Sequence, residues 1–127
     1  MTETLEDVVD GSRDVSIWAR DEDHVAFLAE RPVRPGHTVV CTVALVDSVF
    51  DLDPDSSARL WAFVRDVGVR LRERLPCERV CVQVIGWAVR HAHVHLIPTD
   101  AAGEVPGLDG APLPAAAERA LLDRLRR

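Results

Sequence analysis

Three histidines alternate with apolar residues in the run His91-Ala92-His93-Val94-His95. Successive side chains of a β-strand point to opposite faces, and each residue advances by about 3.3 Å. A strand over this run would place the three imidazoles in one row on an exposed side, about 6.6 Å apart, and turn the apolar side chains toward a core. Because a free imidazole has a pKa of about 6.5, such a row offers neutral nitrogens for chemistry near pH 7.

Three interpretations of this row remain open from the residues alone. The histidines can be structural residues that only make hydrogen bonds. They can bind a metal ion, since neutral imidazole is a common ligand of zinc and iron, although no HExxH motif or pair of carboxylates accompanies the row. They can also act at phosphorus, where a neutral imidazole attacks and forms a covalent nucleotidyl-histidine.

Bulk properties narrow the class of protein. The 127 residues suit one domain, and the net charge of −6 argues against nucleic-acid or membrane partners, which favour clusters of basic residues. No segment approaches the ~20 apolar residues of a membrane span, and no secretion signal is apparent. Cys41, Cys77 and Cys81 are expected to be reduced thiols, so the sequence predicts a cytoplasmic protein.

Five strands are predicted to position the histidines. Residues 1–13 are polar and acidic and predict a flexible lead-in, followed by a single domain over residues 14–127. Apolar and β-branched runs between turn residues predict strands at residues 15–20, 24–28, 37–46, 78–85 and 88–97.

One long helix is predicted between the third and fourth strands. Asp53 can cap it, Pro54 fits its first turn, and Pro76 ends it. Apolar residues recur every three or four positions and form one face of this helix: Leu60, Val64, Val67, Leu71 and Leu75. A loop over residues 103–114 leads to a short helix over residues 115–125. This order predicts an α+β fold in which the main helix packs across an antiparallel sheet.

The histidine run and a segment upstream of it resemble a known family. His91 to Pro98 matches the His-φ-His-φ-His-φ-φ motif, with φ an apolar residue, of the histidine triad family of nucleotide hydrolases and transferases. Ala26-Phe27-Leu28 and the segment from Pro32 to Val40 resemble the family region that carries a fourth functional histidine, here His37, and Phe50-Asp51-Leu52 also fits. The resemblance spans about residues 15–100. It implies a five-stranded antiparallel sheet with one long central helix and a short C-terminal helix, in a two-fold homodimer.

The resemblance also implies a role for each histidine. His93 would be the nucleophile, His91 would help orient it, His95 would hydrogen-bond the phosphate, and His37 would lie behind them. Transferases of the superfamily tend to carry Gln at the position of His95, so hydrolysis is implied over transfer. The implied substrate is a purine nucleotide, either a nucleoside 5′-phosphoramidate or a dinucleoside polyphosphate, cleaved at the α-phosphorus to release a nucleoside monophosphate, with AMP favoured. The implied reaction needs no metal and no cofactor.

Further substrate contacts are expected around the row. Phe27 and Leu28 match the family segment that forms the base and ribose pocket, and the backbone amides near Ala88 and Val89 are expected to help hold the phosphate. Gln83 is the nearby side-chain amide. Arg90 would share a face with the aliphatic residues if the alternation held, which places it outside the site.

Two departures from the family pattern bear on the substrate. Ala29 stands where members often carry an acidic or amide residue for the ribose, and the neighbouring Glu30 is the candidate replacement. Trp87 stands where a polar phosphate contact is common, and it can stack on a base or leaving group or fill a dimer interface. A catalytically silent nucleotide-binding or interaction module that retains the triad therefore stays open, beside the metal-dependent enzyme.

Overall fold

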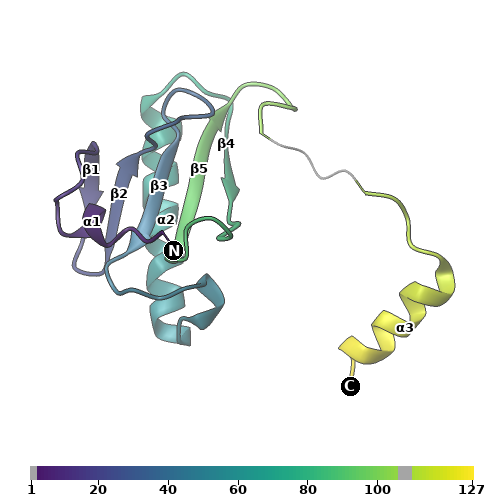
Figure 1. The fold of residues 1–127 in the computed structure, drawn as a ribbon. Coiled ribbons are helices and arrows are strands. Elements are labelled where there is room, and N and C mark those ends of the chain that lie inside the picture. Colours follow the sequence, from purple (N-terminus) through teal and green to yellow (C-terminus); the bar gives the residue numbers. More distant parts are fainter. Residues whose placement is uncertain (1–2, 106–109) are drawn as a thin grey trace.

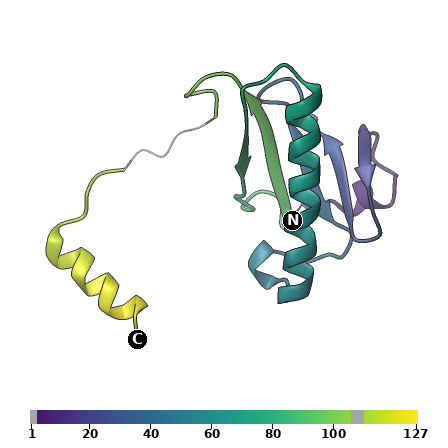
Figure 2. The same ribbon diagram turned by 180° about the vertical axis from the view of Figure 1, so that it is seen from behind.

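The computed structural model describes residues 3–105 and 110–127. Five strands form one antiparallel sheet in the order β1-β2-β3-β5-β4, as Figure 1 shows. Their bounds are β1 Ile17–Arg20, β2 His24–Leu28, β3 Thr38–Thr42, β4 Arg79–Gln83 and β5 His93–Thr99. Helix α2 (Pro54–Arg74) crosses one face of this sheet (Figure 2). The predicted α+β architecture is confirmed.

The sequence signals of α2 correspond to contacts. Asp53 caps the helix by accepting a hydrogen bond from the Ser56 N–H at 2.8 Å, and Pro54 occupies the first turn. The predicted apolar face is buried against the middle strands, in a core of Ala26, Val40, Leu60, Val64, Val67, Leu71, Val94 and Leu96. This packing fixes which face of β5 is left for other uses.

Residues 3–13 of the lead-in are packed against the sheet, whereas the sequence predicted a flexible segment over residues 1–13. A short helix α1 (Glu6–Val9) lies on the face of the sheet opposite α2 (Figure 1). Leu5 and Val8 are buried there in a second core with Val25, Phe27, Val39 and Cys41. Arg13 forms ion pairs with Glu3, Asp7 and Glu30, which fasten the lead-in to the chain after β2. Leu5, Val8 and Val9, among acidic and polar residues, were too weak a pattern to predict this packing.

Two strands are shorter than predicted at the end that matters for the site. β3 ends at Thr42 instead of residue 46, and β5 begins at His93 instead of residue 88. The chain from Val84 to Ala92 is irregular and turns at Gly86, whose φ is 78°. A single turn η1 (Val49–Asp51), capped by Ser48, follows β3. These two irregular segments lie outside the ladder and are available to form a pocket.

Gly36 lets the loop before β3 approach the end of α2. Its φ is 89°, a left-handed conformation that glycine adopts readily. A Cβ at this position would lie 2.5 Å from Leu75 Cδ1 and 3.1 Å from Pro98 Cγ. The glycine therefore permits the close contact that positions the next residue, His37.

The C-terminal part of the described chain contains a third α-helix. Helix α3 (Ala115–Leu125) matches the predicted range, and all of its residues are exposed (Figure 1). None of the helices in the described residues is long and apolar enough to cross a membrane.

Candidate active site

His93 and His95 lie on the face of the sheet opposite α2. In the register of β5 with β3, His93 is opposite Cys41 and His95 is opposite Val39. Directly opposed residues share a face, and Cys41 and Val39 belong to the core under α1. On the other edge of β5, Gln83 of β4 is opposite His95. The ladder thus places Gln83 beside His95.

His37 and His95 are joined by a hydrogen bond that fixes the proton of each ring. The Val33 N–H donates to His37 Nδ1 at 3.1 Å, so Nδ1 of this ring carries a lone pair. The proton of the neutral ring is then on Nε2, which donates to His95 Nδ1 at 2.9 Å. By the same argument, His95 carries its own proton on Nε2 and can donate it to a ligand.

His93 is held in the opposite tautomer. Its Nδ1 lies 2.6 Å from the carbonyl oxygen of His91, and because a carbonyl only accepts, Nδ1 must carry the proton. The lone pair of the neutral ring is therefore on Nε2, for which no hydrogen bond occurs with any described residue. The rings of His93 and His95 meet edge to face, with centroids 5.0 Å apart. A ring nitrogen with a free lone pair and an N–H donor thus lie on adjacent rings.

His91 is a buried support and not an exposed member of the row, which corrects the sequence expectation. Its side chain has no exposed surface and precedes the start of β5. Its Nδ1 accepts from the Leu5 N–H at 3.1 Å, and its Nε2 donates to the Thr42 carbonyl at 2.7 Å. The ring is anchored between the lead-in and the end of β3, and its own carbonyl orients His93.

Burial keeps the linked pair neutral. Desolvation, followed by the nearby His93 and His37, lowers the pKa of His95 to about 4. Desolvation also lowers the pKa of His37. Neither ring is expected to be charged at pH 7, which is consistent with the two tautomers that their hydrogen bonds require.

A hollow of about 160 Å³ opens beside His93. It lies between the segment from Asp47 to Val49 and the turn around Gly86, with His91 and Ala92 also in its wall. His93 is only 7% exposed, so this hollow is the access to its ring. Ligand pockets usually start at about 300 Å³. A phosphate with part of a substrate fits, and the remainder of a nucleotide would have to extend over the surface.

Trp87 stands at the rim of this hollow with 80% of its surface exposed. The Arg90 guanidinium lies 5.8 Å from the centre of the indole ring and donates to Asp47 at 2.8 Å. Arg90 and Asp47 both line the hollow, and sequence reasoning placed neither in the site. The error about Arg90 came from extending strand alternation to residues that are not in a strand. Asp47 had no signal beyond its place after an apolar run.

Other expected substrate contacts lie elsewhere. Leu28 is on the α2 side of the sheet, next to a different cavity, so it cannot share a pocket with the histidines. Phe27 is on the histidine face, but it is 3% exposed in the core under α1. Glu30 is an ion-pair partner of Arg13. These positions give no ribose contact at the hollow.

The backbone near Ala88 and Val89 is used by the lead-in. Val89 forms an isolated bridge with Glu3, and the Arg90 N–H donates to the Glu3 carbonyl at 2.8 Å. The Val89 side chain packs against the core under α1, and Ala88 is exposed. Neither residue lines the hollow.

A metal site was one interpretation of the row. Within residues 3–105 and 110–127, no group of three or more His, Cys, Asp or Glu side chains is arranged to hold a metal ion. At least one nitrogen of each of these four imidazole rings is instead paired with another ring or with the backbone.

Comparisons with known proteins identify the family. The HIT domain model matches residues 11–102. An uncharacterized HIT-like protein of Saccharolobus solfataricus is 26% identical over 97 residues, which cover 72% of this chain and 70% of that protein. A bis(5′-adenosyl)-triphosphatase of Dictyostelium discoideum is 28% identical over 91 residues, covering 68% of this chain and 61% of that protein. A bifunctional bis(5′-adenosyl)-triphosphatase/adenylylsulfatase of Arabidopsis thaliana is 30% identical over 78 residues, covering 58% of this chain and 43% of that protein.

Solved structures share the fold over nearly the whole chain. A HIT family protein of Bacillus subtilis superposes with a TM-score of 0.84 at 17% identity, covering 96% of this chain and 93% of that one. A protein of Streptococcus mutans UA159 superposes with a TM-score of 0.84 at 25% identity, covering 99% and 84%. With the family model matching most of the chain, this protein belongs to the HIT domain family.

Proposed function

We propose that this protein hydrolyses nucleoside 5′-phosphoramidates or dinucleoside polyphosphates at the α-phosphorus and releases a nucleoside monophosphate, with AMP favoured. The observation that carries the proposal is the hydrogen bond from His93 Nδ1 to the His91 carbonyl, because it leaves the lone pair on His93 Nε2 at the wall of the hollow. The names of two relatives, both bis(5′-adenosyl)-triphosphatases, support a nucleotide substrate.

The reaction would proceed in two displacements. His93 Nε2 attacks the α-phosphorus, a P–N bond to the histidine forms, and the bond to the amine or nucleotide leaving group breaks with its electron pair. Water then attacks the same phosphorus, the P–N bond breaks, and His93 recovers its lone pair. The products are the leaving group, which takes up a proton, and a nucleoside monophosphate.

Neighbouring groups would stabilise the charge that develops on the phosphoryl oxygens. His95 is neutral and presents its Nε2–H, so it can donate a hydrogen bond to one oxygen without a change of protonation. Gln83 beside it offers an amide donor. Trp87 at the rim offers a ring face on which a base or an aromatic leaving group can stack.

The proposal includes a two-fold homodimer in the cytoplasm. β4 is an edge strand of the sheet, and the apolar side chains of Val82, Val84 and Ile85 along and after it are exposed. An unpaired edge with apolar side chains favours pairing with a second copy. Cys41, Cys77 and Cys81 are all free thiols, which agrees with a reducing compartment.

A catalytically silent nucleotide-binding module is the second candidate, and specific observations favour it. The hollow is small, Glu30 is committed to Arg13, and no described residue replaces the missing ribose contact at Ala29.

Turnover by a nucleophile variant distinguishes the two candidates. Wild type and His93→Ala would be assayed with adenosine 5′-phosphoramidate and diadenosine triphosphate, and AMP binding would be measured by calorimetry. Hydrolysis predicts that wild type turns over at least one substrate and that His93→Ala loses roughly a thousandfold or more in rate while still binding AMP. AMP binding without turnover by wild type would establish the silent module, and unchanged turnover by His93→Ala would refute the covalent mechanism.

A further inference from the structure

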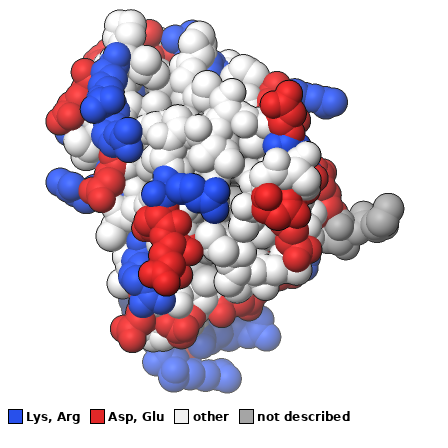
Figure 3. Space-filling view, turned by 90° about the vertical axis from the view of Figure 1, so that its left-hand side faces the viewer, with Lys and Arg blue, Asp and Glu red and all other residues white. Residues whose placement is uncertain are grey.

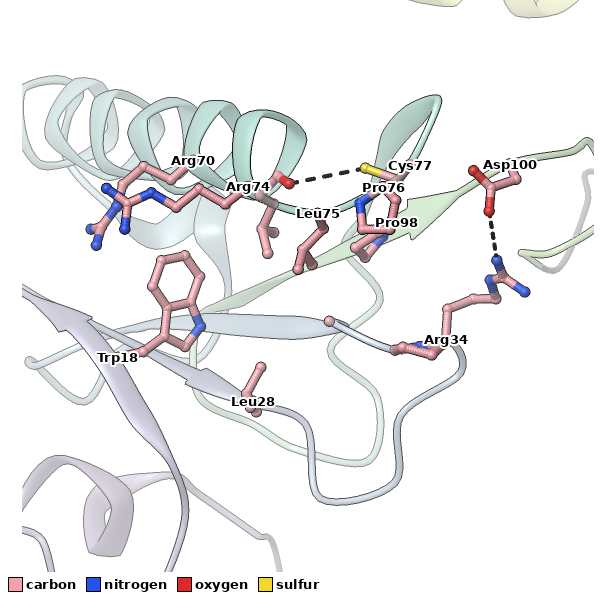
Figure 4. Close-up of a pocket in the computed structure, with 13 residues that line it drawn as sticks. Trp18, Leu28, Arg34, Arg70, Arg74, Leu75, Pro76, Cys77, Pro98 and Asp100 are labelled. Carbon is pink, nitrogen blue, oxygen red and sulfur yellow. Dashed lines mark hydrogen bonds and ion pairs between the residues drawn. The ribbon is translucent and has the colours of Figure 1, made fainter.

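A second cavity lies on the α2 side of the sheet, away from the histidines. Its volume is about 610 Å³, compared with about 160 Å³ for the hollow at His93. It lies where the C-terminal end of α2 meets β1, β2 and the loop before β3 (Figure 4). Its lining residues are Trp18, Leu28, Arg34, Pro35, Gly36 and, from α2 and beyond, Arg70, Leu71, Arg74, Leu75, Pro76, Cys77, Pro98 and Asp100. None of them belongs to the histidine site.

The interior of this cavity is apolar, and part of its apolar wall is exposed to solvent. Leu28 is 42% exposed although it lies in a strand of the sheet. Leu75 and Pro98 face it from the other elements, as Figure 4 shows. The Trp18 ring forms one wall, and its Nε1–H is already satisfied by Thr38 Oγ1 at 3.2 Å. Covering such a surface with an apolar group lowers the free energy of the system.

Two arginines at the end of α2 give the cavity a cationic border. Arg70 places its guanidinium 5.0 Å from the centre of the Trp18 ring, which orients the side chain over the opening. Arg74 follows one turn later and reaches in the same direction (Figure 4). No ion pair of Arg70 or Arg74 occurs within residues 3–105 and 110–127, whereas Arg34 across the cavity is paired with Asp100 and Glu104.

The same arrangement is visible on the surface. Figure 3 views the molecule from the β1 side and shows an uncharged area in the upper part, with basic side chains along its left border. Apolar interior, positive border and a volume within the roughly 300–1,000 Å³ of small-molecule sites together describe a ligand pocket.

We propose that this cavity binds a small organic anion with an extended apolar body, such as a medium-chain carboxylate, with its charged head at Arg70 and Arg74. Guanidinium groups bind carboxylates through paired, charge-assisted hydrogen bonds. Leu28, Leu75 and Pro98 would cover the apolar body. The site lies across the sheet from His93 and is independent of the proposed hydrolysis.

Two other occupants fit less well. Helix α3 carries Arg119 and Arg124 against Glu118 and Asp123, and Arg126 and Arg127 follow it. The segment over residues 115–127 thus has four arginines and two acids, and it offers the arginines at the border less charge complementarity than a free anion does. A nucleotide needs polar partners for its base and ribose, and the lining offers mainly apolar side chains. A second copy of the chain is the remaining competitor, which the experiment below resolves.

Binding of decanoate to the intact protein tests the proposal. Calorimetry and the fluorescence of Trp18, with Trp18→Phe to assign the signal, would measure decanoate and its uncharged counterpart 1-decanol. Wild type is expected to bind decanoate saturably, and excess AMP is expected not to displace it. Arg70→Gln/Arg74→Gln should weaken decanoate binding by about tenfold or more and leave 1-decanol binding unchanged, since only the charge-assisted hydrogen bonds are lost.

A matched control and a filled pocket make the result decisive. Arg65→Gln/Arg72→Gln removes the same charge from exposed positions of the same helix that do not line the cavity, and it should bind as wild type does. Leu28→Trp, which fills the cavity from an already exposed position, should abolish binding of both probes. The absence of saturable binding, equal affinity in the two arginine variants, or binding retained by Leu28→Trp would overturn the proposal. So would self-association that Leu28→Trp abolishes in a protein that does not bind decanoate.

Discussion

His93 and His95 carry their protons on different ring nitrogens, although they are two residues apart on one face of β5. The difference comes from their partners: a carbonyl that only accepts holds His93, and a ring nitrogen that donates holds His95. One histidine can therefore act as a nucleophile at the pH at which its neighbour acts as a donor. Two identical side chains in a row acquire different chemistry from hydrogen bonds alone.

The pKa of His95 has a consequence for stability in acid. Its pKa is about 4 in the folded protein, against about 6.5 in an unfolded chain. Between these values the unfolded chain binds more protons, so the free energy of unfolding falls as the pH decreases from 6.5 to 4. After allowance for the partial exposure of the ring, the loss attributable to this group is on the order of 1–2 kcal/mol.

Denaturant titrations at pH 7 and pH 4.5 would measure this effect. The variant His95→Gln is expected to lose less stability on acidification than wild type, and nuclear magnetic resonance should show the His95 ring neutral at pH 5. Equal pH slopes for the two proteins, together with a ring that titrates near pH 6.5, would contradict the neutral pair.

Substitution of Trp87 tests whether the rim of the hollow contributes to substrate binding. Because a base stacked on an aromatic ring contributes about 1–3 kcal/mol, Trp87→Ala should raise KM about tenfold and change kcat little. The control is Trp61→Ala, which removes a different exposed tryptophan that lies on α2, and it should leave KM unchanged. If Trp87→Ala keeps its KM and instead becomes monomeric in sedimentation, the tryptophan belongs to an interface.

At the scale of the elements, the sequence did not predict that the lead-in contacts the site. The Leu5 N–H holds the buried ring of His91, and the carbonyl of His91 in turn holds His93. The lead-in is thus connected, through His91, to the proposed nucleophile His93 and would help to position it.

Removal of one N–H tests this link. Leu5→Pro lacks the backbone donor and should lower kcat about fivefold, the equivalent of one net hydrogen bond of about 1 kcal/mol, with little change in KM. Leu5→Met keeps the N–H and an apolar side chain, and it should retain activity. If both variants lose activity equally, packing of Leu5 matters and its N–H does not.

The sequence predicted an element correctly where all the signals for that element lie within one short segment. Helix α2 could be predicted because its cap, its first-turn proline and its apolar spacing lie within one segment. The start of β5 could not, because alternation continues in the letters from residue 88 while the backbone is irregular until His93. The four-residue helix α1 offered only two apolar side chains as a signal.

At the scale of the whole molecule, the site is assembled from distant parts of the chain. His37 and His95 are 58 positions apart, and His91 is 86 positions from its partner Leu5. No local pattern predicts such pairs; the family resemblance indicated the first, and nothing indicated the second. Which nitrogen holds each proton depends on backbone atoms that residue identities do not reveal. The sheet separates this site from the apolar cavity under α2.

The central claim is that His93 Nε2 becomes bonded to phosphorus. The most direct measurement is a single turnover of adenosine 5′-phosphoramidate, quenched rapidly and analysed by intact-mass and peptide mass spectrometry. We expect an adenylyl group on the peptide that contains His93, rising and then decaying as AMP appears, and no such adduct with His93→Ala. Turnover without an adduct, or an adduct on another residue, would contradict the assignment of His93 as the nucleophile.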